Sequence, residues 1–279
     1  MLITIKKNIH FWNNHLSGIM RRLTLVIKVL AIITIVVQVS SSYCQSVFSK
    51  GEVIKYKVHY GFINAAVAEM TIGKELRSVN GRNCYEIVVK GESIGMFDFF
   101  LRVRDTWVTY IDTSEIVPMQ FYRIIEEGKY RKHEMVNFNR DSSTAAVRNY
   151  NFKEEYWKPE EQFEVDSGSQ DLVSGYYYIR TLDFDMMIEG DIIALKIFFD
   201  DEMYDFRIRY IGKEEVKTKL GVYPAIVLSP IMPENKLFDG ENSIRVWISD
   251  DEGKIPLKVK ARMFVGAVEI DITDYIRGN

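Results

Sequence analysis

Apolar and polar side chains alternate one for one along much of this chain, and this alternation limits the fold more than any other feature. Over residues 54–60, an aliphatic or aromatic residue alternates with Lys or His. Successive side chains of a strand point to opposite faces, so this period of two predicts strands with one face on a core and one in water. The pattern recurs over residues 85–90, 121–126, 130–139, 192–199, 203–210, 244–249, 257–264 and 267–275.

Short polar turns separate these runs and favour antiparallel neighbours. Asn80-Gly81 is a turn dipeptide, Glu127-Gly128 indicates the turn of a hairpin, and Asp200-Asp201 is a connection short enough for antiparallel neighbours. Residues 250–253 and Val265-Gly266 are equally short connections. The sequence therefore predicts a β-rich protein built from consecutive hairpins.

One segment has helical spacing instead. Apolar residues recur at intervals of three and four over residues 172–180, after Ser169 as the predicted N-cap and Asp171 in the first turn. This predicts a helix of three or four turns, flanked by polar loops at 153–168 and 230–242. The predicted fold class is mainly β, an antiparallel sandwich or an open half-barrel, with one long helix packed on it.

The N-terminal region has the three parts of a secretory signal peptide. No Asp or Glu precedes Glu52; Arg21 and Arg22 stand before an apolar run at 23–39, and small residues follow it. Ser42 and Cys44 fit a cut between Cys44 and Gln45, which makes residues 1–44 the leader. We therefore expect a periplasmic or otherwise exported protein. An uncleaved anchor, lipid attached to Cys44 and a start at Met20 rather than Met1 remain alternatives.

The remaining chain, 45–279, is long enough to form a single β-rich domain without disulfides. Two similar halves, around 50–165 and 190–279, are an alternative reading. Residues 51–54 resemble 190–193, and the run from Asp112 to Met119 resembles that from Asp250 to Leu257. Each run passes through a polar turn into an aliphatic-Pro-aliphatic step.

The charge balance argues against two classes of partner. The leader holds five of the 36 basic residues and none of the 39 acidic ones, so the remaining chain has 31 basic and 39 acidic residues, a net charge of −8. Such an acidic chain offers no electrostatic footprint for nucleic acid or anionic membrane surfaces, so we expect no nucleic-acid partner. Only Cys84 lies beyond the leader, so we expect no internal disulfide.

Three motifs together resemble a known family. Gly51-Glu52 leads into Ile54-Lys55-Tyr56, Asp171-Leu172-Val173-Ser174 precedes Tyr177-Tyr178-Ile179-Arg180, and Trp247-Ile248 precedes Ile255-Pro256-Leu257. Across residues 50–275 the chain resembles an exported bacterial family described as domain of unknown function 3108. This resemblance implies a β-rich exported protein and supplies no activity, ligand or catalytic residue. The closing strands are also similar to the half-barrel lipoprotein carriers of the envelope.

A nucleophile motif is present, but its surroundings favour a structural turn. Residues 91–95 read Gly-Glu-Ser-Ile-Gly, and Asp112 and His133 follow Ser93 in an order that a hydrolase triad permits. The mechanism needs a strand before the serine and a helix after it, whereas residues 96–112 indicate an extended segment. We therefore assign no catalytic residue.

Metal and cofactor sites are not indicated either. His59 and His133 lie in predicted strands without helical pairing, and the acidic groups at 183–185, 200–202 and 250–252 have no calcium-loop ligand pattern. The sequence contains no glycine-rich phosphate loop. It predicts no metal and no cofactor.

Large apolar side chains gather in three places: Phe97, Phe99 and Phe100; Phe184, Met186 and Met187; and Phe198 and Phe199. Between a curved sheet and a helix they would line a groove for an acyl chain, or they would simply fill the core.

The leading hypothesis is a non-catalytic envelope protein that binds an apolar or lipid-like molecule or another envelope protein, with no membrane span after cleavage. A secreted hydrolase and a structural partner in an envelope assembly are the alternatives. The three hypotheses predict an enclosed apolar cavity, a cleft with paired ionisable groups, and an exposed apolar patch, respectively.

Overall fold

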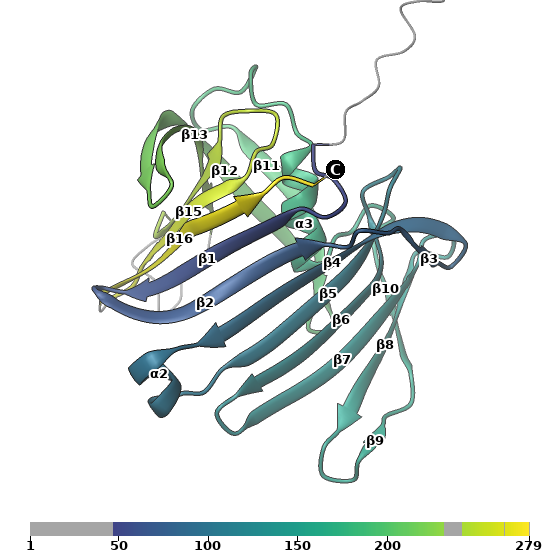
Figure 1. Cartoon of the computed structure of the whole chain (residues 1–279). Helices are drawn as coiled ribbons and strands as arrows, with labels where there is room; N and C mark the ends of the chain where they lie inside the picture. Colours follow the sequence, from purple (N-terminus) through teal and green to yellow (C-terminus); the bar gives the residue numbers. More distant parts are fainter. Residues whose placement is uncertain (1–46, 232–241, 265, 279) are drawn as a thin grey trace, which may run out of the picture. The chain divides into compact units, whose positions relative to one another are not determined.

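The computed structural model describes residues 47–231, 242–264 and 266–278, and these form one coiled antiparallel sheet with two short helices (Figure 1). Neighbouring strands of the sheet follow the order β10-β8-β7-β6-β5-β4-β2-β1-β16-β15-β14-β13-β12-β11, with β3 paired to β4 and β9 to β8. The elements are β1 (Val53–Tyr60), β2 (Ile63–Ile72), β3 (Arg77–Val79), β4 (Arg82–Ser93), α2 (Gly95–Phe100), β5 (Arg104–Asp112), β6 (Pro118–Glu127), β7 (Tyr130–Asn139), β8 (Thr144–Asn151), β9 (Tyr156–Trp157), β10 (Glu161–Glu164), α3 (Leu172–Arg180), β11 (Ile192–Phe199), β12 (Glu202–Thr218), β13 (Gly221–Pro230), β14 (Ile244–Ser249), β15 (Pro256–Arg262) and β16 (Ala267–Ile276).

The sheet is continuous because its first strand pairs with its last. β1 lies between β2 and β16, antiparallel to both, so the two sequence halves share one ladder. The sheet ends at β10 and β11, and Gln170, in the segment between β10 and α3, forms an isolated parallel bridge with Ile197 of β11. An open, mainly β architecture was predicted correctly, whereas a sandwich of two separate sheets is not what forms.

The predicted tight turns are present where the sequence placed them. Asn80 and Gly81 have φ values of 51° and 78°, and Asp200 and Asp201 have φ values of 49° and 67°. Positive φ at both central residues is the backbone that matches the twist of a two-residue hairpin. Asn and Asp tolerate this conformation because their short polar side chains bond locally.

The helix prediction needs two corrections. α3 has nine residues, shorter than the predicted three or four turns, and its N-cap is Asp171 rather than Ser169. The main chain of Gln170 still bonds to β11, so the backbone stays extended until Asp171. The segment 96–112, predicted as extended, begins inside α2.

A reciprocal capping box starts α3. One carboxylate oxygen of Asp171 accepts the backbone N–H groups of Val173 and Ser174, both at 2.8 Å, and the Ser174 hydroxyl accepts the Asp171 N–H at 2.9 Å. The other oxygen accepts the Thr109 hydroxyl of β5 at 2.6 Å. Asp171 is fully buried, and this burial raises its pKa despite the hydrogen bonds.

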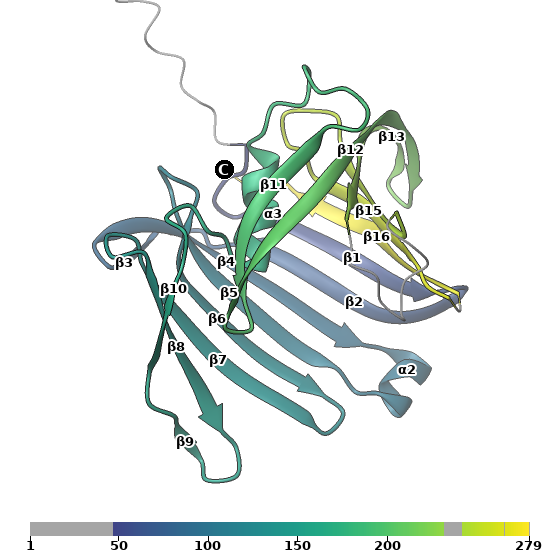
Figure 2. The ribbon, with the colours of Figure 1, turned by 180° about the vertical axis from the view of Figure 1, so that it is seen from behind.

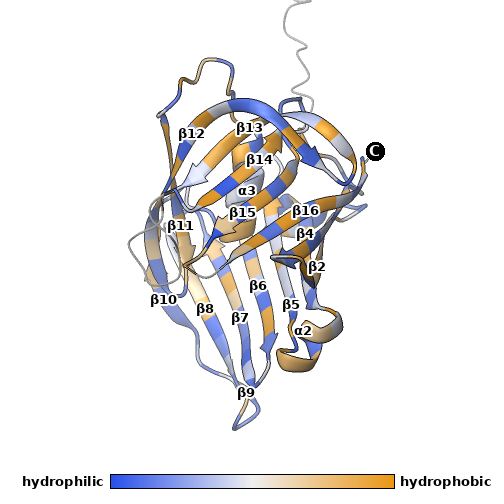
Figure 3. Ribbon diagram, turned by 90° about the vertical axis from the view of Figure 1, so that its left-hand side faces the viewer, coloured by the Kyte–Doolittle hydropathy of each residue, from blue (hydrophilic) through white to orange (hydrophobic). Residues whose placement is uncertain are grey.

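The helix fills the inside of the curved sheet, between β5 on one side and β11 on the other (Figure 2). Side chains alternate between apolar and polar along the strands, as Figure 3 shows, and the apolar ones form three packed clusters. The first joins α3 to the strands from β2 to β8 and includes Phe48, Ile87, Phe138, Val173 and Tyr177. The second includes Ile54, Tyr56, Val227 and Trp247, and the third includes Phe184, Leu195 and Ile226.

Arg180, the last residue of α3, binds both halves of the sheet at once. Its guanidinium donates to both carboxylate oxygens of Glu52 at 2.6 and 2.8 Å, and to the backbone carbonyl of Gly253 at 2.9 Å. Glu52 precedes β1, and Gly253 lies in the turn between β14 and β15. The Arg180 side chain is fully buried, and its guanidinium faces the rings of Phe48 and Tyr177.

The two turns that suggested an internal repeat are built alike. Ile116 and Lys254 each adopt a left-handed backbone, with φ of 54° and 44°, directly before a buried aliphatic residue and a buried proline. A carboxylate accepts two turn N–H groups in both places, Asp112 in one and Asp251 in the other. The division into two similar halves stays a prediction.

Candidate interaction surface

Ser93 of the Gly-Glu-Ser-Ile-Gly motif serves as a structural bridge between β4, α2 and β5. Its hydroxyl donates to the Asp98 carboxylate at 2.6 Å and accepts the backbone N–H of Val103 at 2.8 Å. Arg104 donates to the same Asp98 oxygen at 2.7 Å and lowers the pKa of that carboxyl. The hydroxyl is therefore fully engaged in holding the short helix.

The other members of the considered triad lie elsewhere. Asp112 pairs with Cys84, nine residues from Ser93 along β4, which is about 30 Å at the usual rise of a strand. Its carboxylate accepts the N–H groups of Ser114 and Glu115. His133 packs against the ring of Phe152, with 4.8 Å between ring centroids. The geometry does not assemble a serine hydrolase site from these three residues.

The acidic clusters stabilise turns or form ion pairs. Asp183 accepts the backbone N–H of Asp185 at 2.9 Å, and Asp251 accepts that of Gly253 at 2.9 Å. Asp200 pairs with Lys132 at 2.6 Å. Among the described residues, no three His, Cys, Asp or Glu side chains are arranged to hold a metal ion.

A buried charge cluster closes the β11–β12 hairpin onto the inner face of the sheet. Arg123 of β6 pairs with Glu134 of β7 at 2.8 Å and with Asp200 at the hairpin tip. Its guanidinium also lies 4.5 Å from the ring centroid of Phe199, which stacks on Trp107. Partial burial alone would raise the pKa of Asp200, but the bonds from Lys132 and Arg123 outweigh it and lower that pKa. Every charge but one in this cluster has a partner inside the fold.

The exception is Asp201, next to Asp200. Its Oδ1 atom is buried without a hydrogen-bond partner, and burial, followed by the nearby Glu134 carboxylate, raises the pKa of this carboxyl. The other charged groups of the cluster form ion pairs with one another. These ion pairs hold the β11–β12 hairpin against β6 and β7.

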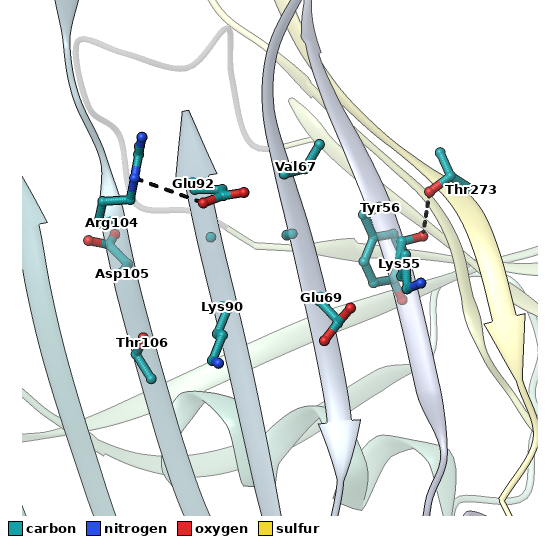
Figure 4. Close-up of a pocket in the computed structure, with 12 residues that line it drawn as sticks. Lys55, Tyr56, Val67, Glu69, Lys90, Glu92, Arg104, Asp105, Thr106 and Thr273 are labelled. Atoms are coloured by element: carbon teal, nitrogen blue, oxygen red, sulfur yellow. Dashed lines mark hydrogen bonds and ion pairs between the residues drawn. The ribbon is translucent and has the colours of Figure 1, made fainter. Parts of the chain in front are cut away.

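Two hollows on the surface of the described residues carry charged side chains. The first, of about 480 Å³, lies over β1, β2, β4 and β5 and carries charged rows, such as the register partners Lys55, Glu69 and Lys90 (Figure 4). These residues alternate with core residues and so lie on the face turned away from the core. The second, of about 410 Å³, is lined mainly by Asn, Arg and acidic side chains near the β7–β8 turn.

The groove predicted between sheet and helix does not correspond to either hollow. Phe184 and Phe198, which were expected to line it, are buried in the packed clusters beside α3. Tyr177 and Val173 of α3 pack directly against residues of the sheet. These side chains follow the alternative interpretation, in which they fill the core.

Exposed apolar side chains instead gather at one end of the sheet, in what we call the apolar rim. It consists of Phe62 in the β1–β2 turn, Met96, Phe99, Phe100 and Leu101 in and after α2, and Phe264 in the β15–β16 turn. Between 48% and 97% of the surface of these side chains is exposed. An apolar patch of this kind on a monomer marks an interaction site.

Main-chain and ring contacts bring these three segments together. Gly61 donates its N–H to the carbonyl of Ala267 at 3.2 Å, which joins the β1–β2 and β15–β16 turns. The rings of Tyr60 and Phe97 meet edge to face at 6.4 Å, which joins the β1–β2 turn to α2. In Figure 1, the β1–β2 tip and α2 lie along the same side of the molecule, and Figure 3 shows α2 as a largely hydrophobic coil at the sheet's end.

The sequence pattern points to part of this rim but predicts a different role for it. Phe99 and Phe100 were assigned to a groove or a core, yet 86% and 77% of their surface is exposed. Phe62 and Phe264 were not singled out. The available signal was their position: both are large aromatic residues inside hairpin turns, where polar residues and glycine normally dominate.

A family model described as a protein of unknown function, DUF3108, matches residues 55–273. The chain belongs to the DUF3108 family. This confirms the resemblance seen in the three sequence motifs. No curated protein matches this DUF3108 member significantly.

One solved structure supports the fold. A β-barrel-like protein of the DUF1849 domain from Brucella abortus superposes with a TM-score of 0.51 at 7% identity, over 83% of this chain and 99% of that one. At such low identity the similarity concerns the fold alone. An inferred lipoprotein from Parabacteroides distasonis has a TM-score of 0.29 at 11% identity, covering 84% of this chain and 99% of its own. An inferred exported protein with a YmcC-like fold from Bacteroides fragilis has a TM-score of 0.30 at 9% identity, covering 82% and 97%.

Within the described part of this DUF3108 protein, neither helix is long and apolar enough to cross a membrane.

Proposed function

We propose that this protein is an exported, non-catalytic interaction protein of the cell envelope, and that the apolar rim is its working surface. The observation that carries this proposal is the convergence of exposed aromatic side chains from turns far apart in the sequence. Phe62 and Phe264 come from opposite ends of the domain, and the β1–β2 turn that holds Phe62 is joined both to the β15–β16 turn and to α2. Export rests on the leader predicted at residues 1–44.

The chemistry of the remaining surface supports binding over catalysis. Ser93, the one nucleophile in a recognisable motif, is bonded into the α2 junction. The charged groups of Arg123, Glu134 and Arg180 are buried and paired inside the fold. Exposed large apolar side chains cost solubility unless a partner covers them, so a rim of six such residues indicates a surface that is covered in use.

Site-specific photocrosslinking in cells tests the proposal. A photoreactive amino acid replaces Phe99 in the rim, and a matched control replaces Met186, which is 87% exposed in the loop before β11. We expect adducts with an envelope component, lipid or protein, from position 99 and far fewer from position 186. Equal yields at the two positions, or none at either, would contradict the proposed role of the rim.

A further inference from the structure

The charge around the apolar rim is opposite in sign to that of the whole protein. Four segments are linked at this end of the sheet: residues 60–64, 94–103, 217–222, and the described residues 262–264 and 266–267. They contain four basic residues, Arg102, Lys217, Lys219 and Arg262, and one acidic residue, Asp98. The chain beyond the leader is acidic, with a net charge of −8, so this end is a local cationic region.

Asp98 is the single acid in these segments; in the adjoining strands, Glu92 lies 3.8 Å from Arg104, and Asp271 lies 3.3 Å from Lys258. The Asp98 carboxylate is occupied by the Arg104 guanidinium at 2.7 Å, so that pair is neutral. The β12–β13 turn reaches the same end, because the Lys219 ammonium lies 3.3 Å from the His59 ring near the end of β1. The neighbouring β6–β7 turn, joined by a bond from Gly128 to Arg102, carries residues of both signs.

Electrostatic screening makes the local charge more important than the total. At physiological ionic strength the Debye length is about 8 Å, so acidic residues at the far end of the sheet are largely screened from a surface that touches the rim. The overall acidity that argued against anionic surfaces in the sequence therefore does not decide what this end binds.

We infer that the rim docks on the surface of an anionic lipid bilayer, an inference that rests on the proposed function of the rim. Aromatic and aliphatic side chains at separate turn tips enter the boundary between headgroups and acyl chains. The apolar face of an interfacial amphipathic helix occupies the same depth. Arg102, Lys219 and Arg262 lie at the level of the lipid phosphates. Each tip contributes a shallow anchor, and the sheet itself stays outside the bilayer.

Phe62, Phe99 and Phe264 belong to three different tips, which makes the attachment multivalent. Basic side chains beside apolar tips are the combination that attracts peripheral proteins to anionic leaflets. A protein partner would need no local excess of positive charge unless its own surface were acidic. Charge complementarity therefore favours lipid.

Vesicle flotation with the protein exported from cells expressing the full chain tests this inference. Vesicles contain either phosphatidylcholine alone or phosphatidylcholine with phosphatidylglycerol. We expect clear binding to the anionic vesicles, weaker binding to the neutral ones, and release as salt increases. The F99S/F100S variant should lose affinity by about tenfold or more, because two large apolar anchors are removed.

Two further variants test whether the basic residues determine the lipid preference and whether binding depends on the rim. The K219Q/R262Q variant should bind neutral vesicles as the wild type does but lose its preference for anionic ones. The matched control M186S/I188S removes exposed apolar residues outside the rim and should bind like the wild type. Circular dichroism checks that each variant is folded.

Several results would overturn the lipid inference. One is an absence of wild-type binding to either vesicle, and another is equal binding by wild type and F99S/F100S. A third is a dimer in sedimentation that the rim variant abolishes, without vesicle binding, which would assign the rim to a second copy. If crosslinking from position 99 yields a specific protein adduct while vesicles are not bound, the proposed function stands and the lipid inference fails.

Discussion

Arg180 shows how a single residue can join distant parts of a mainly β chain. Its guanidinium is fully buried and donates to the Glu52 carboxylate and to the Gly253 carbonyl. A charge in this position is tolerated only because every donor direction meets an acceptor or an aromatic face. The sequence placed Arg180 on the helix, but its partners lie 128 and 73 residues away, so local patterns could not reveal them.

We expect the Arg180→Met variant to lose about 3–5 kcal/mol of unfolding free energy, because it leaves the Glu52 carboxylate buried and unpaired. Urea titration followed by circular dichroism measures the loss. The double variant Arg180→Met/Glu52→Leu should recover part of it, since no isolated charge remains.

Lys196→Met provides the matched control for Arg180. Lys196 pairs with Asp205 at 2.6 Å, but both side chains are more than half exposed, so its removal should cost far less than that of Arg180. If Arg180→Met costs no more than this control, the buried pair does not stabilise the fold as described.

At the scale of elements, the turns and the alternating strands were predictable from the sequence. The ends of the strands, the start and length of α3, and the presence of α2 were not. The run 192–199 coincides with β11, and residues 200–201 form its turn. Main-chain pairing of Gln170 with β11 shortened the helix at its start, and only tertiary contact supplies that pairing. α2 was not predicted, because six residues are too few to show whether the apolar side chains recur with the period of a helix or of a strand.

The β11–β12 turn carries a pH-dependent contribution to stability. The folded-state pKa of Asp200 is lowered, since the bonds from Lys132 and Arg123 outweigh the effect of burial. Its contribution is therefore present above the unfolded pKa of about 3.9 and is lost as pH falls through the lower folded-state value. We expect Asp200→Asn to be less stable than wild type at pH 7 and to lose less stability on acidification.

Urea midpoints at neutral pH and near pH 3 measure this difference for Asp200→Asn. Asp205→Asn serves as control, because its ion pair with Lys196 is exposed. Identical acid sensitivity of wild type and Asp200→Asn would show that the turn contributes nothing to the pH dependence.

On the scale of the whole molecule, the two sequence halves share one continuous sheet. Phe198 of β11 packs on Phe138 of β7, with 6.1 Å between ring centroids, and β1 pairs with β16. The sequence predicted antiparallel strands but not that the first and last would be neighbours, because pairing between distant strands leaves no local signal. The rim was hidden for the same reason: Phe62 and Phe264 become neighbours of α2 only in the folded sheet.

We expect a single unfolding transition in both halves. Trp107 and Trp157 report on the first half, and Trp247 reports on the second. In a Trp247→Phe variant, and in a Trp107→Phe/Trp157→Phe variant, the fluorescence midpoint in urea should coincide with that of circular dichroism. A fluorescence transition separate from the circular dichroism transition in either variant would indicate independently folding halves.

The direction of β1 has a practical consequence for how the domain is presented. The strand starts beside Arg180 and ends at Tyr60, next to the rim, about 25 Å away at the usual rise per residue. A tag, bead or surface attached ahead of Val47 would hold the domain by the end remote from its aromatic tips. In that orientation the immobilised protein exposes its aromatic tips to the solution, where they can bind the molecules that flow past.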